Sequence, residues 1–369
     1  MSVAPLTTPL TVLLKIKHPV MLAGMCTLVR HPPACTSAGY TPAFLKSQIA
    51  ELKAELTDKK APFGVDLLLP QVRILIPRGD PSGVRFTTFS DILKYYSGPI
   101  YHTAREVSSG KAHGSNFADT GGQLPELIDI IIAEGASLFV CAVGVPPVWA
   151  VEKLHKAGIP VMNMVGAPKH VAKALAQGCD IICAQGGEGG GHTGDVPASI
   201  LIPACVDECR GKKSPLTGGP VLVVGAGGIY NGKGLAASLA YGAAGVWVGT
   251  RFICAEEAGA SKAHQDAVLT AGHNDTIRTI IFTGRPLRIR KNPFVLDWEE
   301  NRQEEIKELT GKGKLPVGMD TEERPHLMGS VSAMVQTIEP AKKIVDDMVK
   351  EAAIILRNNA KLVNPQAKL

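Results

Sequence analysis

A glycine-rich stretch that holds one histidine is the part of this sequence best suited to chemistry. Six glycines fall within the nine residues 186–194, and His192 is the imidazole of that run. Because glycine has no Cβ, a flat ring or a phosphate can lie directly against such a backbone. Gln185 precedes the run at the end of an apolar segment, where its amide can face a ligand. The stretch predicts a ligand-binding loop; the alternative is a flexible surface loop with an incidental histidine.

A second glycine-bearing region lies between residues 220 and 252. An apolar strand ends at Gly227 and Gly228, an alanine- and leucine-rich helix follows, and a second strand ends at Gly249 and Thr250. Two such turns beside helix starts would form a phosphate cradle. In (β/α)₈ barrels the phosphate site commonly follows strands seven and eight. The region therefore predicts a phosphate-bearing ligand and no particular reaction, with ordinary packing glycines as the alternative.

Strands and helices alternate along most of the chain, which is typical of a parallel α/β sheet. We place strands near residues 19, 65, 140, 162, 183, 222 and 247. A closed barrel needs an eighth strand, which would lie between residues 25 and 41, where two prolines interrupt a stretch without helical periodicity. Residues 73–120 lack a sustained apolar pattern and form an atypical insertion, either functional or disordered. We expect one domain over residues 1–369, with a mainly helical extension over 255–358 that closes the barrel.

The expected helices cover residues 41–56, 124–134, 146–157, 168–176, 199–210, 258–271, 298–309 and 338–358, and residues 1–17 read as a loose lead-in. Residues 283–288 form a basic turn that has two interpretations. It is either a solvated loop, or it brings an arginine to the phosphate or to the rim of an active site.

Composition excludes several classes of protein. The net charge of +5 comes from 39 basic and 34 acidic residues that are spread along the chain, which argues against a nucleic-acid partner. The eight cysteines form no Cys-x-x-Cys pair, and no cluster of histidines accompanies them. We therefore expect buried free thiols and no metal site. No apolar stretch is long enough to span a membrane, and no signal peptide is evident. The final tripeptide, 367–369, is close to the Ser-Lys-Leu peroxisomal signal, which leaves a peroxisomal or a cytoplasmic location.

These motifs together closely resemble the nitronate monooxygenase family, formerly called 2-nitropropane dioxygenase, of the fungal type. The resemblance rests on residues 184–194, 227–229 and 247–252, with support from 158–165, 275–279 and 283–287. It implies a TIM-type (β/α)₈ barrel that holds FMN without a covalent bond. It also implies oxidation of alkyl nitronates by O₂ to a carbonyl compound and nitrite, with use of neutral nitroalkanes and a homodimeric state left open.

The resemblance also assigns roles to individual residues. His192 matches the catalytic histidine, which acts on the substrate as a base or a polarising group. A histidine pKa near neutrality would suit proton abstraction from a carbon acid. Other residues match positions that bind FMN. Gln185, Gly190 and Gly191 match residues that line the flavin, and Gly24 and Met25 match the turn under its ring. The residues that match the phosphate site are Gly227, Gly228, Gly249 and Thr250.

Two departures from the family pattern leave other interpretations open. Residues 26–37 stand where the family has a small-residue helix and an Ala-Gly-Gly-Leu-Gly turn, and residues 73–120 are additional. We hypothesise that both come from a mis-spliced or diverged gene, which an intact transcript encoding them would refute. The alternatives are another FMN barrel that is a reductase using NAD(P)H, and an inactive paralogue with a damaged first βα unit. A separate dinucleotide site is not indicated, because no acidic residue follows Gly225 at the usual distance.

Overall fold

A parallel sheet forms the centre of the molecule. The computed structural model describes residues 4–23, 41–69 apart from 57 and 59, 122–317 and 325–364. Within these residues, seven parallel strands lie in the order β1-β8-β7-β5-β4-β3-β2. Their bounds are β1 (Val20–Leu22), β2 (Gly64–Leu68), β3 (Leu138–Ala142), β4 (Val161–Val165), β5 (Ile181–Gln185), β7 (Leu222–Ala226) and β8 (Gly245–Val248). All seven predicted strands are confirmed.

The strand order is that of a barrel. Sequential strands are neighbours, and the last strand, β8, pairs with the first through Val20 and Val246. This arrangement arises when a parallel sheet curls until its ends approach, and it confirms the predicted TIM-type fold. The described edges are β1 and β2, so an eighth strand belongs between them. The sequence placed that strand between residues 25 and 41, and residues 24–40 lie outside the described part.

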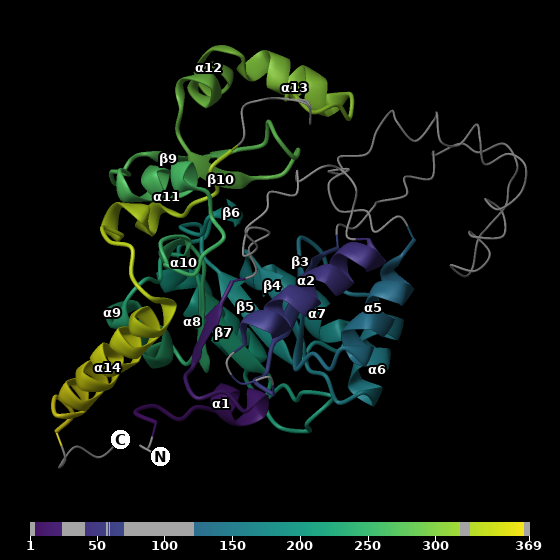
Figure 1. Cartoon of the computed structure of the whole chain (residues 1–369), viewed down its shortest axis with the longest axis vertical. Helices are drawn as coiled ribbons and strands as arrows, with labels where there is room; N and C mark the ends of the chain where they lie inside the picture. Colours follow the sequence, from purple (N-terminus) through teal and green to yellow (C-terminus); the bar gives the residue numbers. More distant parts are fainter. Residues whose placement is uncertain are drawn as a thin grey trace, which may run out of the picture.

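Helices cover the outer face of the sheet (Figure 1). They are α2 (Pro42–Glu55), α5 (Leu124–Ala133), α6 (Val148–Lys156), α7 (Val171–Ala176), α8 (Ala198–Cys209) and α9 (Gly232–Ala240), with a 3₁₀ turn, η3 (Pro168–His170), before α7. The Thr41 side chain accepts from the Phe44 N–H and Pro42 starts α2, so the predicted helix start is confirmed. In α5, Leu127, Ile128 and Ile131 are fully buried against the sheet.

A short helix that the sequence did not predict seals one end of the barrel. Helix α1 (Pro9–Leu14) lies at the N-terminal ends of the strands (Figure 1) and buries Leu10 and Leu14 in the apolar interior. Thr8 and Thr11 form a reciprocal capping pair at its start. Residues 1–17 were expected to be a loose lead-in. That expectation was wrong for this segment, because six residues are too few to display helical periodicity.

The same end of the barrel contains a buried carboxylate with four partners. Asp180 precedes β5, and its side chain is fully buried. One oxygen, Oδ2, lies 2.8 Å from His155 Nε2 and accepts from the Val161 N–H at 2.8 Å. The other accepts from the Ser214 hydroxyl at 2.6 Å and from the Leu216 N–H at 3.2 Å. The group therefore links three successive connections that lead from a helix into a strand, before β4, β5 and β7, at the base of the barrel.

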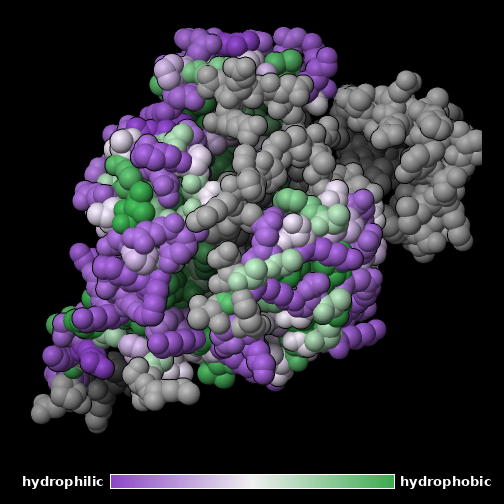
Figure 2. Space-filling view, viewed as in Figure 1, coloured by the Kyte–Doolittle hydropathy of each residue, from purple (hydrophilic) through white to green (hydrophobic). Residues whose placement is uncertain are grey.

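The C-terminal third is less helical than the sequence suggested. Strands β9 (Thr276–Thr279) and β10 (Leu287–Arg290) form an antiparallel sheet with β6 (Gly191–His192), in the order β6-β10-β9. The predicted helix over 298–309 is two helices, α12 (Pro293–Asn301) and α13 (Gln303–Gly311), which meet at Arg302. Hydrophilic residues cover much of their outer surface (Figure 2). The remaining elements are α10 (Thr250–Ile253), α11 (Lys262–Leu269), η4 (Ser330–Met334) and α14 (Ala341–Ala360).

Helix α14 returns to the barrel and packs on α9. At Gly232 an added Cβ would lie 2.5 Å from the Met348 carbonyl oxygen, so only glycine permits this close approach. The Gly232 N–H donates to the Glu351 carboxylate at 2.8 Å, which caps the start of α9 from a neighbouring helix. Arg251 is buried and donates to Glu339 at 2.6 Å, which fixes the chain before α14.

Three predictions about the whole chain bear on this fold. The six cysteines of the described part are free and buried, as expected: Cys141, Cys179, Cys183, Cys205, Cys209 and Cys254. Within the described residues, no group of three or more His, Cys, Asp or Glu side chains is placed to hold a metal ion. No helix that the structure describes is long and apolar enough to cross a membrane.

Candidate functional site

The predicted basic turn lies against the glycine-rich loop. Strand β10 pairs with β6 so that Leu287 is opposite His192, and the Thr193 N–H donates to the Pro286 carbonyl at 3.3 Å. Arg288 Nε donates to the Gly187 carbonyl at 2.9 Å. The turn is therefore part of the rim around His192, and the interpretation as a solvated loop is wrong.

A buried threonine sets the orientation of the His192 ring. Thr283 Oγ1 lies 3.0 Å from His192 Nε2 and 3.1 Å from the Arg285 carbonyl oxygen. A hydroxyl has a single hydrogen to donate. The hydroxyl can give that hydrogen to the Arg285 carbonyl or to Nε2; the first assignment, which we adopt, places the ring proton on Nε2 and leaves the Nδ1 lone pair unprotonated.

Electrostatics keep this imidazole neutral. Burial, followed by the positive charge of Arg285, lowers the pKa of His192 to about 4. The sequence analysis expected a pKa near neutrality. The difference arises because two features that the sequence did not place, the enclosing rim and the neighbouring guanidinium, both disfavour the imidazolium ion. At physiological pH His192 is consequently available as a proton acceptor.

Gln185 holds the loop that carries His192. Its amide Nε2 donates to the His192 carbonyl at 2.9 Å, so the side chain turns along the loop from the end of β5. Thr193 Oγ1 donates to the Gly186 carbonyl at 2.8 Å and closes the same loop from its other end. A direct contact of Gln185 with a flavin stays a prediction.

The glycines of this loop face the protein's own backbone. A Cβ added at Gly190 would lie 2.7 Å from Met328 C and Gly329 N, and one at Gly186 would lie 2.6 Å from Ala198. Gly191 has φ 71° with no neighbour within 4 Å of an added Cβ, so it is needed for its conformation. We expected these glycines to make room for a ring. At Gly186 and Gly190 the structure instead uses the missing side chain for close packing within the chain.

The glycines that follow β7 and β8 are different, because their turns keep unused donors. Gly227 and Gly228 have φ values of 89° and 73°, and their turn lies beside Gly249 and Thr250 because Ala226 pairs with Trp247. The backbone N–H groups of Gly228, Gly249 and Thr250 make no hydrogen bond within the described residues. Unused donors at the ends of two adjacent strands fit the phosphate of a flavin nucleotide.

A segment near the C-terminus, residues 326–330, lies across both glycine regions. The Gly329 N–H donates to Thr250 Oγ1 at 2.9 Å, and the Ser330 N–H donates to the Glu188 carbonyl at 2.9 Å. The Glu188 carboxylate in turn accepts from the Ala198 N–H at the start of α8. This segment was not predicted, because nothing in its residue types indicates a contact with residues so distant in sequence.

Two further residues belong to the site. Thr283 and Arg285 were noted only as members of a basic turn, and the structure brings both to His192. By contrast, the predicted residues Gly24 and Met25 lie outside the described residues. The structure thus brings together His192, Gln185, Gly190 and Gly191 in one loop and Gly227, Gly228, Gly249 and Thr250 in the adjacent turns.

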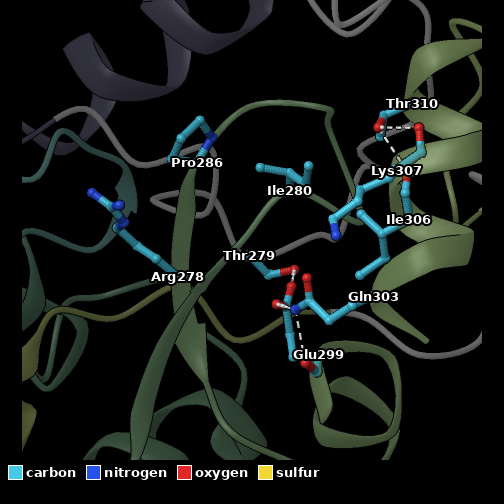
Figure 3. A pocket seen from close by; sticks show the side chains of 9 residues that line it. All are labelled: Arg278, Thr279, Ile280, Pro286, Glu299, Gln303, Ile306, Lys307 and Thr310. Carbon is cyan, nitrogen blue, oxygen red and sulfur yellow. Dashed lines mark hydrogen bonds between the residues drawn. The ribbon is translucent and has the colours of Figure 1, made fainter. Parts of the chain in front are cut away.

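A cavity of about 240 Å³ lies behind the rim, between β9 and the helices α12 and α13 (Figure 3). Its polar groups already have partners, since Glu299 accepts from Thr279 Oγ1 and from Gln303 Nε2. Arg278 extends away from these groups in the same view and pairs with Asp195. The cavity does not open among the glycine turns, so we attribute no part of the chemistry to it.

The family model of nitronate monooxygenase matches residues 8–351, a range that contains every described part of this site. The chain belongs to the nitronate monooxygenase family. A protein of Mycobacterium tuberculosis described as a monooxygenase is 31% identical over 346 residues, which are 85% of this chain and 86% of that protein. Family membership makes this chain a flavin-dependent oxidoreductase, and it confirms the resemblance seen in the sequence.

Other relatives show how widely this family extends. A (3aS,4S,5R,7aS)-5-hydroxy-7a-methyl-1-oxo-octahydro-1H-indene-4-carboxyl-CoA dehydrogenase of M. tuberculosis is 32% identical over 79% of this chain and 68% of its own. The crystal structure of nitroalkane oxidase from Streptomyces ansochromogenes matches with a TM-score of 0.65 and 22% identity, over 96% of this chain and 99% of that one. These relatives are bacterial, so a fungal subtype within the family is not supported.

Proposed function

We propose that this chain oxidises alkyl nitronates with O₂, using FMN, to a carbonyl compound and nitrite. The observation that carries the proposal is the pairing of a neutral, oriented imidazole with unused backbone donors at one end of the barrel. His192 is held by Thr283 at 3.0 Å, and the N–H groups of Gly228, Gly249 and Thr250 lie at the ends of β7 and β8. Family membership supports flavin chemistry, and the phosphate cradle supports a flavin mononucleotide.

The residues present fit that cofactor. The N–H groups after β7 and β8, with the Thr250 hydroxyl, would hold the phosphate, and Gln185, Gly190 and Gly191 would lie along the flavin. Gly24 and Met25 are proposed to lie under the ring on the basis of sequence alone. The flavin would accept electrons from the substrate and pass them to O₂. The protein supplies position and electrostatics.

His192 is proposed to act on the substrate directly. Its Nδ1 atom carries the unprotonated lone pair and can accept a proton from the carbon next to a nitro group, which a neutral nitroalkane would require. A nitronate has already lost that proton and needs no base, so the ring would polarise it only with Nδ1 protonated, a form that the bound anion favours. The low pKa makes the ring a weaker base than was expected, but it keeps the base form fully populated at neutral pH.

The second candidate function is reduction or dehydrogenation with a nicotinamide nucleotide. The relative named as a carboxyl-CoA dehydrogenase supports it, because it matches most of this chain. The two candidates share a flavin site and differ in the compound that reduces the flavin. An inactive paralogue is the third interpretation, and it predicts a protein that does not retain FMN.

The C-terminal tripeptide 367–369 supports a peroxisomal location, with the cytoplasm as the alternative, and a fluorescent fusion at the N-terminus tests it.

The deciding experiment is a visible spectrum of the purified protein, followed by anaerobic addition of ethyl nitronate or NADPH. We expect a flavin spectrum that is bleached by the nitronate, and nitrite production once air is admitted. Bleaching by NADPH alone would contradict the nitronate proposal and support the reductase. A colourless protein that does not take up added FMN would support the inactive paralogue.

A further inference from the structure

The Arg285 guanidinium lies near His192 and, among the described residues, has no carboxylate partner. Its NH1 group donates to the Val143 carbonyl at 3.0 Å, and its Nε atom is buried with no hydrogen-bond partner among the described residues. Three other arginines of the C-terminal third each have a carboxylate partner: Arg251 with Glu339, Arg278 with Asp195 and Arg290 with Asp275. No acidic group of the described part pairs with Arg285.

Such an arrangement is costly unless a ligand completes it. Burial lowers the pKa of the Arg285 guanidinium, which shows that the charge has lost part of its hydration. A half-buried positive charge without a carboxylate partner costs free energy, which a bound anion would offset. The same charge also disfavours protonation of His192. An anion bound between the two side chains would reverse both effects.

The backbone that receives Arg285 is itself unusual. Val143, directly after β3, has φ 68°, a left-handed conformation that a β-branched residue rarely adopts. Conformations of this kind persist where surrounding contacts enforce them, and they cluster at ligand sites. Here the enforced conformation presents a carbonyl to the NH1 group of Arg285. The contact uses one side of the guanidinium, so Nε and NH2, the edge that matches a planar oxyanion, have no hydrogen-bond partner among the described residues.

The phosphate of a flavin nucleotide is not the anion in question. Arg285 is anchored at the end of β3, whereas the unused N–H groups follow β7 and β8. In the sheet order, β4 and β5 separate β3 from β7. Three strand spacings correspond to about 14 Å along the sheet. The two positive sites therefore lie on opposite sides of the barrel mouth, with His192 on the loop after β5 between them.

We propose that Arg285 binds the anionic nitronate group of the substrate, with its Nε–NH2 edge facing the two nitronate oxygens beside His192. This inference rests on the proposed function and goes further, since it names the residue that selects the nitronate over the neutral nitroalkane. A nitronate is planar and shares one negative charge between two oxygens, which matches the guanidinium edge. A neutral nitroalkane carries no net charge and gains little from the same contact.

The test compares Arg285→Gln and Arg285→Lys with the unmodified holoenzyme. Arg210→Gln is the matched control, because it removes the same charge from an exposed site at the far end of α8. Nitrite production gives kcat and KM for ethyl nitronate and for nitroethane. Nitrate, an unreactive planar anion, is titrated calorimetrically into each protein. For Arg285→Gln we expect KM for the nitronate and the Kd of nitrate to rise about 10- to 100-fold, with kcat changing less.

The remaining outcomes are equally decisive. Arg285→Lys should recover part of the nitrate affinity, because it keeps the charge and loses the fork geometry, and KM for nitroethane should stay close to the unmodified value. An unchanged KM for ethyl nitronate and unchanged nitrate affinity in a folded, flavin-bearing Arg285→Gln protein would overturn the inference. An equal rise for nitroethane would also overturn it, as general damage. If the unmodified enzyme does not oxidise nitronates, the proposed function fails, and the nitrate titrations still decide whether Arg285 binds an anion.

Discussion

The two ends of the barrel differ in whether their buried polar groups have hydrogen-bond partners. At the N-terminal end, the buried Asp180 carboxylate has four partners. At the C-terminal end, Arg285 Nε and the N–H group of the buried Thr250 have no partner in the described part. Buried polar groups in folded proteins are normally satisfied. The satisfied end therefore contributes to the stability of the fold, whereas the unsatisfied end is where we propose that ligands bind.

The largest expected effect is on chemistry at the unsatisfied end. For His192→Ala we expect kcat/KM for nitroethane to fall about 100- to 10,000-fold, because the base that takes the carbon proton is lost, and kcat/KM for ethyl nitronate to fall less. Flavin content and thermal stability should change little. His273→Ala, at an exposed position, is the control. A variant that keeps nearly full activity would show that the imidazole is not part of the reaction.

The opposite pattern is expected at the satisfied end. Asp180→Asn replaces an acceptor oxygen by an NH₂ group that faces donors, since Val161, Ser214 and Leu216 all donate to the carboxylate. We expect a loss of about 2–4 kcal/mol in the free energy of unfolding, measured in urea, with kcat/KM of the folded protein unchanged. Asp207→Asn, in an exposed ion pair with Arg210, should cost less than about 1 kcal/mol. Equal losses in the two variants would remove the contrast between the ends.

Two glycines at the C-terminal end of the barrel are expected to have different roles, one in packing and one in cofactor binding. Gly190→Ala places a methyl group 2.7 Å from the backbone of Met328 and Gly329, so we expect a loss of about 1–3 kcal/mol in stability of the apoprotein. Among the described residues, Gly249→Ala meets only Ala23, at 3.4 Å, and should leave the apoprotein stable while it weakens FMN binding. Urea unfolding and FMN titration of both variants separate the two roles. The reverse result would show that the proposed cradle lies elsewhere.

A smaller effect is expected at Thr283. Thr283→Val keeps the shape of the side chain and removes the acceptor for the His192 ring proton, so the imidazole is no longer held in one tautomer. We expect kcat/KM to fall about 10-fold, and Thr283→Ser should recover most of it. Nitrogen NMR of labelled histidine should show the Nε2-protonated form in the unmodified protein and a mixture in Thr283→Val. Full activity in Thr283→Val would exclude a positioning role.

The smallest effect is a pH dependence of stability. The pKa of His192 is about 4 in the folded protein and about 6.5 in an unfolded chain. The unfolded state therefore binds more protons between these values, and stability falls as the pH is lowered from about 6.5 to about 4. The unmodified protein should therefore lose stability relative to His192→Ala as the pH falls through this interval, which unfolding free energies of the two proteins measure. A difference that does not depend on pH would show that the ring is not buried in the folded state.

The fold was largely predictable because it repeats a local pattern. Apolar strands such as 181–185 and glycine turns such as 227–228 carry their signal within a few residues, and the seven strands are confirmed. Helix α1 was missed because it is too short to show a period. Strands β9 and β10 were missed because their stability comes from pairing with β6, which is distant in sequence.

The site was predictable only in its local parts. His192, Gln185 and the glycine turns lie in recognisable motifs, but the neighbours that give them their properties come from elsewhere in the chain. Thr283 and Arg285 approach His192 through the pairing of Leu287 with it. Met328 and Gly329 fill the space beside Gly190. The low pKa of His192 follows from these tertiary contacts, and no single stretch of sequence could have given it.

The segment 326–330 has a consequence for the order in which the protein becomes functional. Both glycine regions are translated well before residue 326, but their loops reach the described arrangement only when Gly329 bonds to Thr250 and Ser330 to Glu188. Helix α14 then caps α9 through Glu351. During synthesis on the ribosome, the strands of the barrel can therefore assemble while the cofactor site is still open. We therefore expect cofactor capture at the proposed site to be a late step, which follows emergence of nearly the whole chain.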